Sequence, residues 1–371
     1  MTKKLFKIVL FILVILIFFY LFSNGRFFCS SLGKTKEQKY LSLFSEIATL
    51  VKNDYVETVN PEKKFPGAFS SMLAHLDKLS AYLDPEKTRI YKLYEKGILY
   101  STGIYGIKLI NYFYITDVVK NSPAEYVGLQ AGDIVKSVKG KTIFSLSFWE
   151  MYFSLLTEKL ENIDLVIFKK GTSELDKINL KTKLINCNTR IKKIKNDVFY
   201  VELLKIDKLS VKLIKERLMN KKSLRLIIDL RKYSGGDFDS FIDITRLFFK
   251  KTTSVVIKTK EKEEKVLLGS VNPLKFKAVV IINQSTIMYS ELLAALFKSI
   301  NTTLIGSKTQ GFISKLDHIS LKDGSSVLIT GGIFLLKGKD LRKSEVNPEI
   351  KLKDKDWEHI LDKSLFILEK Y

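Results

Sequence analysis

The stretch KAVVIINQSTIMYSELLAALFKSI, residues 277–300, combines residue types that could hold a catalytic nucleophile. It predicts a buried strand, a tight polar turn and then a helix. Many hydrolases place a serine at such a strand-to-helix turn, because the turn lifts one side chain clear of the sheet. The middle of this turn instead reads Thr286, Ile287, Met288 and Tyr289. A methionine thioether has no ionisable proton to lose, so it cannot act as an activated nucleophile.

Hydroxyls and amines near this turn leave a shifted catalytic pair open. Ser285 and Ser290 are the nearby hydroxyls, and Lys308 and Lys315 are the nearby amines. Two residues along a helix rotate a side chain by about 200°, so Ser290 is expected to point away from the direction of Met288. We expect Ser290 to be an ordinary first-turn residue whose hydroxyl bonds exposed backbone N–H groups.

The first 25 residues are expected to determine the compartment. Three lysines, Lys3, Lys4 and Lys7, precede the apolar run IVLFILVILIFFYLF at residues 8–22. This order is typical of a signal peptide or a signal-anchor helix, and its length approaches the roughly 20 residues needed to span a bilayer. We expect a retained anchor at residues 1–25, with a cleaved signal as the alternative. Either way, the bulk of the chain is expected outside the cytoplasm, anchored to the inner or cell membrane in a periplasmic-type location.

Charge and composition exclude several function classes. The formal net charge is +22, but the lysines are scattered and form no basic stripe with interleaved aromatic residues, so we expect no nucleic-acid partner. Three histidines and two cysteines form no cluster with metal-ligand spacing, so we expect no metal and no cofactor. The sequence leaves open whether Cys29 and Cys187 pair.

Residue patterns divide the exported part into three regions. Residues 26–96 read as a helical lead-in domain, with helices expected over 36–60 and 69–83. Residues 97–185 contain short β runs punctuated by glycine. From residue 186 to 371, strands alternate with helices over 207–219, 238–249 and 290–300 and a closing C-terminal helix. This alternation predicts a mostly parallel sheet, with ligands at the carboxyl ends of its strands.

The stretch NSPAEYVGLQAGDIVKSVKGKTI, residues 121–143, is the most informative part of the β region. Pro123 opens a one-turn helix at its tolerated first position, and Gly128 ends it. This order of elements resembles the PDZ domain, which captures a C-terminal carboxylate and adds the peptide as a strand. The resemblance places peptide binding at Gly103, Ile104, Tyr105 and Gly106. Tyr105 departs from the Gly-Ile-Gly of that loop, which weakens the inference because tyrosine lacks glycine's freedom at positive φ.

Four stretches in order resemble the carboxyl-terminal processing proteases, also called tail-specific proteases. They are residues 72–84, the PDZ segment, IIDLRKYSGGDF at 227–238 and residues 282–311. The resemblance runs from about residue 36 to 352. It implies a multidomain α+β fold with a helical lead-in, a PDZ β domain and an α/β peptidase core of the ClpP/crotonase-like type with a mostly parallel sheet.

The resemblance also implies a chemistry. In this family a serine attacks a peptide carbonyl, a buried lysine takes its proton, and a glutamine four residues later supports the lysine. Anchored on Ser290 and Glu291, the nucleophile position falls on Met288, the base on Phe312 and the glutamine on Leu316. All three replacements are apolar, so we expect no catalytic residue at these positions.

The double-glycine loop carries the family's oxyanion-binding backbone. The resemblance places it at Gly235 and Gly236, which we expect to keep an anion-binding backbone nest. Asp229 and Arg231 are expected to be structural partners rather than catalysts.

The function expected from these residues is that of an inactive relative. It would bind protein C-termini or unfolded segments as an adaptor or regulator, with an active paralogous protease or a second copy of the chain as further partners. The alternative is an active serine endopeptidase that cleaves C-terminal regions with a relocated Ser/Lys dyad, for which Ser290 and Lys308 are the candidates. A scaffold protein with an idle PDZ domain is a third reading.

Overall fold

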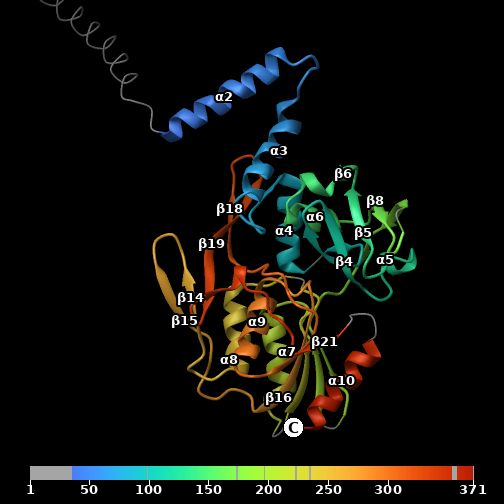
Figure 1. Cartoon of the computed structure of the whole chain (residues 1–371), viewed down its shortest axis with the longest axis vertical. Helices are drawn as coiled ribbons and strands as arrows, with labels where there is room; N and C mark the ends of the chain where they lie inside the picture. The colour runs from blue at the N-terminus through green and yellow to red at the C-terminus, as the bar shows by residue number, and fades with distance from the viewer. Residues whose placement is uncertain are drawn as a thin grey trace, which may run out of the picture. The chain divides into compact units, whose positions relative to one another are not determined.

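The computed structural model describes residues 36–97, 99–172, 174–195, 197–221, 224–233, 235–352 and 357–370 (Figure 1). The described residues divide into two units, with the boundary between Phe65 and Pro66. Among the described helices, none is long and apolar enough to cross a membrane. The expected anchor at residues 1–25 and Cys29 lie outside the described residues, and Cys187 forms no disulfide with a described residue.

Two helices begin the described chain. Helix α2 spans Lys36–Asp54 and has no buried residue; α3 spans Pro61–Ala74. The predicted helix over 36–60 is thus confirmed in its first part. The apolar side chains of α2, including Phe44 and Ile47, are exposed.

The predicted helix over 69–83 is wrong at its end. The carboxylate of Asp77 accepts the N–H groups of Leu79 and Ser80 at 2.8 and 2.7 Å, which turns the chain out of the helix. Residues Ala81–Leu83 then form strand β1, which pairs antiparallel with β19, Ser326–Leu336. Helix α4, Pro85–Lys96, follows with Asp84 as its N-cap.

The region expected to be PDZ-like contains a sheet of antiparallel pairs in the order β3-β4-β5-β8-β9. As predicted, Pro123 opens helix α5, which Ser122 caps. A small second sheet has the order β10-β2-β7. The bounds are β2 Tyr100–Ser101, β3 Ile104–Leu109, β4 Tyr112–Val118, α5 Pro123–Tyr126, β5 Ile134–Val138, β6 Lys141–Thr142, η1 Ile143–Ser145, α6 Phe148–Ser154, β7 Leu156–Thr157, β8 Asn162–Phe168, β9 Leu175–Lys181 and β10 Lys183–Leu184.

Helix α6 is buried along its whole length. Ser147 and Glu150 form a capping box at its start. The helix packs against α4. The ring centroid of Tyr94 on α4 lies 5.8 Å from that of Tyr152 and 5.5 Å from that of Phe153. These edge-on aromatic contacts fix the PDZ-like region against the segment that precedes it.

The second half of the chain contains a six-stranded sheet in the order β11-β12-β13-β16-β17-β21. Every pair is parallel except β11 with β12, which confirms the predicted mostly parallel sheet. The bounds are β11 Arg190–Lys193, β12 Val198–Glu202, α7 Lys208–Leu218, β13 Leu224–Asp229, α8 Phe238–Phe248, β16 Phe276–Ile282, α9 Met288–Ser299, β17 Thr303–Gly306, β21 Ile350–Lys351 and α10 Trp357–Glu369.

Alternate residues of this sheet face two different apolar layers. Val201 and Ile228 belong to the main core with α7, α8 and α9, whereas Ile227 and Val279 pack with Ile360 of α10. Figure 1 shows the three helices on one side of these strands and α10 on the other. The two-residue period of the strands therefore buries both faces.

A further sheet runs in the order β1-β19-β14-β15, with β18 and β20 also paired to β19. Strand β18 directly follows the loop after β17. That loop contacts the start of α9, because its Phe312 carbonyl accepts the N–H of Met288. The remaining bounds are β14 Ser254–Lys258, β15 Glu263–Leu267, β18 Lys315–Ser320, β20 Lys339–Asp340 and η2 Leu341–Lys343.

Candidate functional site

Met288 stands at the junction between β16 and α9. It is a non-glycine residue with φ at +53°, and it is 5% exposed. L-residues other than glycine rarely adopt this left-handed conformation, which costs on the order of 1–3 kcal/mol. The strained turn that a nucleophile mount requires is therefore present, and a methionine occupies it.

Polar groups brace the turn from within. The hydroxyl of Thr286 accepts the N–H of Asn283 and donates to the carbonyl of Leu230, both at 3.0 Å. The buried Ser285 hydroxyl forms a hydrogen bond with that of Thr116 on β4. These two hydroxyls tie the turn to neighbouring strands, so Ser285 has a structural partner.

Phe312 closes the space in front of Met288. The backbone N–H of Met288 donates to the carbonyl oxygen of Phe312 at 2.6 Å. The Phe312 side chain is 2% exposed, and its ring lies edge-on to Phe148 of α6 with 5.2 Å between centroids. The N–H of a nucleophile is a natural oxyanion donor. Here that N–H is directed to a carbonyl of the same chain.

Leu316 lies on β18, beside a bulge between Lys315 and Leu316 in the pairing with β19. Its side chain is half-buried and packs against the main apolar core. The third position that the family resemblance assigns to catalysis therefore makes apolar contacts.

The candidate substitutes are not arranged as a dyad. Both carboxylate oxygens of Glu345 lie 2.9 Å from the Lys308 ammonium, and the Lys308 side chain is 49% exposed. The Lys315 ammonium lies 3.4 Å from Asp317 and is also partly exposed. A lysine acts as a general base when burial disfavours its charge, and these two lysines are solvated and paired with acids.

Ser290 is fully buried, and the prediction for its hydroxyl is wrong. Its Oγ has no hydrogen-bond partner among the described residues, and its backbone N–H donates to the carbonyl of Ile287 at 3.2 Å. The start of α9 is enclosed, so the hydroxyl is separated from the exposed N–H groups that a cap would serve.

Glu291 holds the loop that carries Phe312. Its Oε1 accepts the N–H of Gly311 at 2.8 Å, and the side chain is buried. Burial raises the pKa of Glu291 to about 7, although hydrogen bonds from the loop around Thr309 oppose this shift. Removal of this carboxylate would release the backbone beside the old base position.

The double-glycine loop needs glycine at both positions. Gly235 and Gly236 have φ of +100° and +154°. A Cβ on Gly236 would lie 2.4 Å from the carbonyl oxygen of Ile206, and one on Gly235 would lie 2.9 Å from the ring of Tyr94. The expected anion-binding nest stays a prediction.

Asp229 and Arg231 form a buried pair, as the sequence predicted. The Arg231 Nη2 lies 2.7 Å from Oδ2 of Asp229, and the hydroxyl of Tyr200 donates to the same oxygen at 2.8 Å. Burial alone would raise the pKa of Asp229, but Arg231 holds this pKa below its usual value.

The PDZ loop is enclosed. Gly103 has φ at +84°, and a Cβ there would lie 2.2 Å from Cβ of Ser122. Ile104 and Tyr105 are buried, and β3 is bulged between Tyr105 and Gly106. The cavity at this loop measures about 30 Å³, enough for about one water molecule. Peptide capture here remains a prediction that requires the loop to open.

A larger cavity of about 280 Å³ adjoins Phe312. Lys78 and Lys108 line it together with Phe148. The Lys78 ammonium lies 5.3 Å from the Phe312 ring centroid and donates to the carbonyl of Gln310 at 2.9 Å. Burial lowers the pKa of Lys108. The sequence interpretation missed both lysines; Lys78 falls within the 72–84 stretch, which was the available signal, whereas nothing marks Lys108.

Residues 197–352 match peptidase family S41, and residues 114–153 match the PDZ domain. These matches cover the two regions in which the structure contains the parallel sheet and the α5–α6 segment. These matches support the expected resemblance to the carboxyl-terminal processing proteases. The matches confirm the predicted combination of a PDZ domain with a peptidase core.

Curated relatives and a solved structure agree with this assignment. The carboxy-terminal processing protease CtpA of Bacillus subtilis (strain 168) is 25% identical over 366 residues, covering 95% of this chain and 78% of that protein. A probable CtpA-like serine protease of Staphylococcus aureus (strain MRSA252) is 26% identical over 326 residues, 85% of this chain; the chain spans only 65% of that relative's length. The photosystem II D1 C-terminal processing protease has the same fold, with a TM-score of 0.63, 21% identity and coverage of 86% of this chain and 90% of that one.

Proposed function

We propose that this protein does not cleave peptides and instead binds protein C-termini or unfolded segments as an adaptor or regulator. The observation that carries the proposal is the hydrogen bond from the Met288 N–H to the Phe312 carbonyl, between two buried apolar residues at the nucleophile and base positions. Acyl transfer needs a nucleophile, a base and a free oxyanion donor. None of these three groups is available at this turn.

Two features outside the former catalytic positions support peptide binding: the PDZ match and the cavity beside Phe312. The PDZ match suggests recognition of peptide C-termini. The cavity of about 280 Å³ beside Phe312 offers a space next to the old reactive centre. A bound chain in that cavity would meet the ammonium of Lys78 and the ring of Phe148.

The location and the partners are part of the same proposal. The basic start and the apolar run at residues 8–22 favour a membrane anchor with the remaining chain on the extracytoplasmic side. An active paralogous protease of the same family is the partner that such an adaptor would regulate, and self-association is the second candidate.

A cleavage assay tests the inactive reading. The full-length chain in mild detergent is incubated with an unfolded protein that ends in an apolar tail, and fragments are followed by mass spectrometry. We expect no turnover. Turnover that Ser290→Ala abolishes and Met288→Ala leaves unchanged would contradict the proposal.

Binding is tested separately with two peptides that differ only in their C-terminal group. A peptide with a free C-terminus is compared with the same peptide as an amide, because only carboxylate capture distinguishes them. We expect the free acid to bind more tightly by about tenfold, the size of one charge-assisted hydrogen bond. Equal affinity would favour a scaffold with an idle PDZ domain.

The alternative function is an active endopeptidase with a relocated dyad. The observation in its favour is the Ser290 hydroxyl, which is buried and has no hydrogen-bond partner among the described residues. A fluorophosphonate probe tests it, because the probe labels an activated serine. Labelling that disappears in Ser290→Ala would support this alternative, and the proposed inactivity predicts no labelling.

A further inference from the structure

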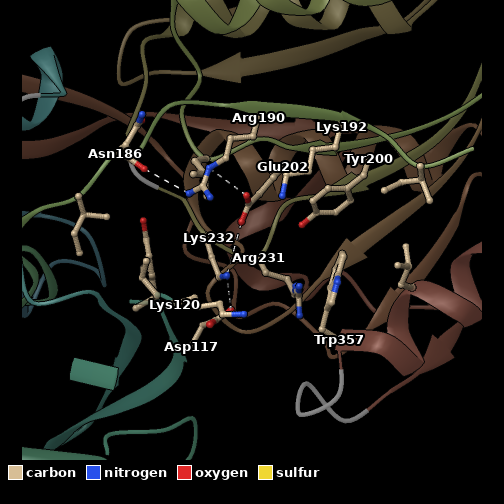
Figure 2. Close-up of a pocket in the computed structure, with 16 residues that line it drawn as sticks. Asp117, Lys120, Asn186, Arg190, Lys192, Tyr200, Glu202, Arg231, Lys232 and Trp357 are labelled. Carbon is tan, nitrogen blue, oxygen red and sulfur yellow. Dashed lines mark hydrogen bonds and ion pairs between the residues drawn. The ribbon is translucent and has the colours of Figure 1, made fainter. Parts of the chain in front are cut away.

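A cavity of about 440 Å³ lies at the carboxyl ends of β12 and β13 (Figure 2). Its walls come from β4 of the PDZ region, from β11 and β12 of the parallel-sheet region, and from the start of α10. The lining residues do not include Met288, Phe312 or Leu316. The carboxyl ends of strands are the edge where open α/β sheets bind ligands, yet this cavity is separate from the old reactive centre.

Strand geometry explains why charged side chains gather here. Arg190 and Lys192 alternate on β11, so both project from the same face. Their cross-strand partners on β12 are Glu202 and Tyr200, which project from that face as well. Helix α10 covers this face further along and begins at Trp357, so the strand ends beyond it stay open.

Most of the lining charges neutralise one another. Arg231 is paired with Asp229 at 2.7 Å. The Lys232 ammonium lies 3.4 Å from Asp117 and 3.8 Å from Glu202. The Arg190 guanidinium lies 3.5 Å from Glu202, and Figure 2 shows the ion pairs that link Arg190, Glu202, Lys232 and Asp117.

Two positive charges at the cavity remain uncompensated. Lys120 and Lys192 line it, both are exposed, and neither forms an ion pair with a described residue. The cavity therefore has an excess of two positive charges, supplied by one lysine from the PDZ region and one from β11.

An aromatic surface adjoins the charged one. Trp357 is 38% exposed, and its ring lies edge-on to Tyr200 with 4.9 Å between centroids. The guanidinium carbon of Arg231 lies 5.6 Å from the Trp357 ring centroid. Ile194 and Leu361 add apolar lining. An indole held in place on one side and open on the other is a suitable contact for an apolar or aromatic group.

We propose that this cavity binds a short acidic peptide segment, in which two carboxylates contact Lys120 and Lys192 and an apolar side chain packs on Trp357. The cavity volume is in the range of small-ligand sites, and its mixed lining matches an amphipathic peptide better than a phosphate alone. The site does not require the reactive centre to be inactive, but Tyr105 of the PDZ loop also lines the cavity, so the inference rests on the peptide-binding part of the proposed function. Because its walls come from both regions, a bound peptide would bridge the PDZ domain and the peptidase core.

The test uses the full-length chain and a fluorescein-labelled tetrapeptide with one aromatic residue followed by two acidic residues. Lys120→Gln with Lys192→Gln is expected to weaken binding about tenfold, since two partly solvated ion pairs are lost. Lys177→Gln with Lys181→Gln is the matched control: both residues lie on β9, are exposed and do not line the cavity. The control removes the same charge and should change affinity less than twofold.

Intrinsic fluorescence provides a second readout. The chain has two tryptophans, of which Trp149 is buried and Trp357 is partly exposed. Peptide binding should change the emission of Trp357, and Trp357→Phe should abolish this change while the labelled peptide still binds. A peptide with amides in place of its acidic side chains should bind at least fivefold more weakly.

Three results would overturn the inference. One is equal weakening by the cavity variant and the β9 control, which would mean that only net charge matters. Another is the absence of binding at millimolar peptide in low salt. The third is anionic lipid vesicles that bind in a Lys120- and Lys192-dependent manner while the peptide does not, which would identify a lipid surface as the ligand.

Discussion

The Glu291 carboxylate accepts the N–H of Gly311 at 2.8 Å, across 20 residues of sequence, in a buried site. This bond positions the loop that leads into Phe312. A carboxylate that is buried yet hydrogen-bonded is a candidate for a pH-dependent contribution to stability.

The first prediction concerns this carboxyl. Its pKa is raised to about 7 from a usual value near 4.5. Between these two pH values the folded state keeps the Glu291 proton while the unfolded state has lost it. The contribution of this carboxyl to the free energy of unfolding is therefore fully present below about pH 4.5 and is lost as the pH rises towards 7. The loss is on the order of 3 kcal/mol. Urea unfolding between pH 5 and 8 should show this decline in the wild type, and Glu291→Gln should remove it. Equal slopes in both proteins would contradict the prediction.

The second prediction concerns the reactive positions. Met288→Ser alone should give no hydrolysis and no fluorophosphonate labelling, because Lys308 and Lys315 are exposed and paired with acids and the N–H of residue 288 is bonded to Phe312. The matched arm is the triple variant Met288→Ser, Phe312→Lys and Leu316→Gln. Labelling of the triple variant but not of the single one is the expected pattern. Labelling of the single variant would reveal a base that this structure does not place there.

The third prediction concerns packing. Phe312→Ala should lower the free energy of unfolding by about 3–5 kcal/mol, because the ring is buried against Phe148. Phe144→Ala is the control, since Phe144 is exposed, and its effect should stay within about 0.5 kcal/mol. Chemical denaturation by guanidinium measures both. Similar small effects would mean that the space around Phe312 collapses after truncation.

The fourth prediction concerns the buried ion pair. Arg231→Met should destabilise the protein by about 3–5 kcal/mol, because it leaves Asp229 buried without its partner. Lys195→Met breaks the exposed pair with Glu369 and should cost less than about 1 kcal/mol. Thermal unfolding of the two variants makes the comparison. A small effect of Arg231→Met would indicate that Asp229 becomes protonated at little cost.

Much of the fold follows from local patterns in the sequence. The alternation of apolar runs and helical stretches predicts α7, α8 and α9, which begin within two residues of the expected positions. Pro123 likewise predicts α5. These features depend on neighbours along the chain, and sequence periodicity reports such neighbours directly.

Features that depend on distant partners are harder to predict. Residues 81–83 form a strand because β19 lies beside them, and nothing within the segment itself requires this. The enclosure of Ser290 and the position of Lys78 beside Phe312 likewise arise from segments far apart in sequence. The cavity of Figure 2 combines residues from positions 105 to 361, so no single stretch indicates it.

The complete burial of α6 limits how the PDZ domain can respond to a ligand. If the PDZ domain rotated away from its neighbour, the contact surfaces between them would become exposed to water. Those surfaces include the contacts of Phe148 with Phe312 and of Tyr152 with Tyr94. Exposing even one such ring costs on the order of several kcal/mol. Any signal that passes through this protein is therefore better carried by small adjustments in a rigid body than by a large rotation of one domain.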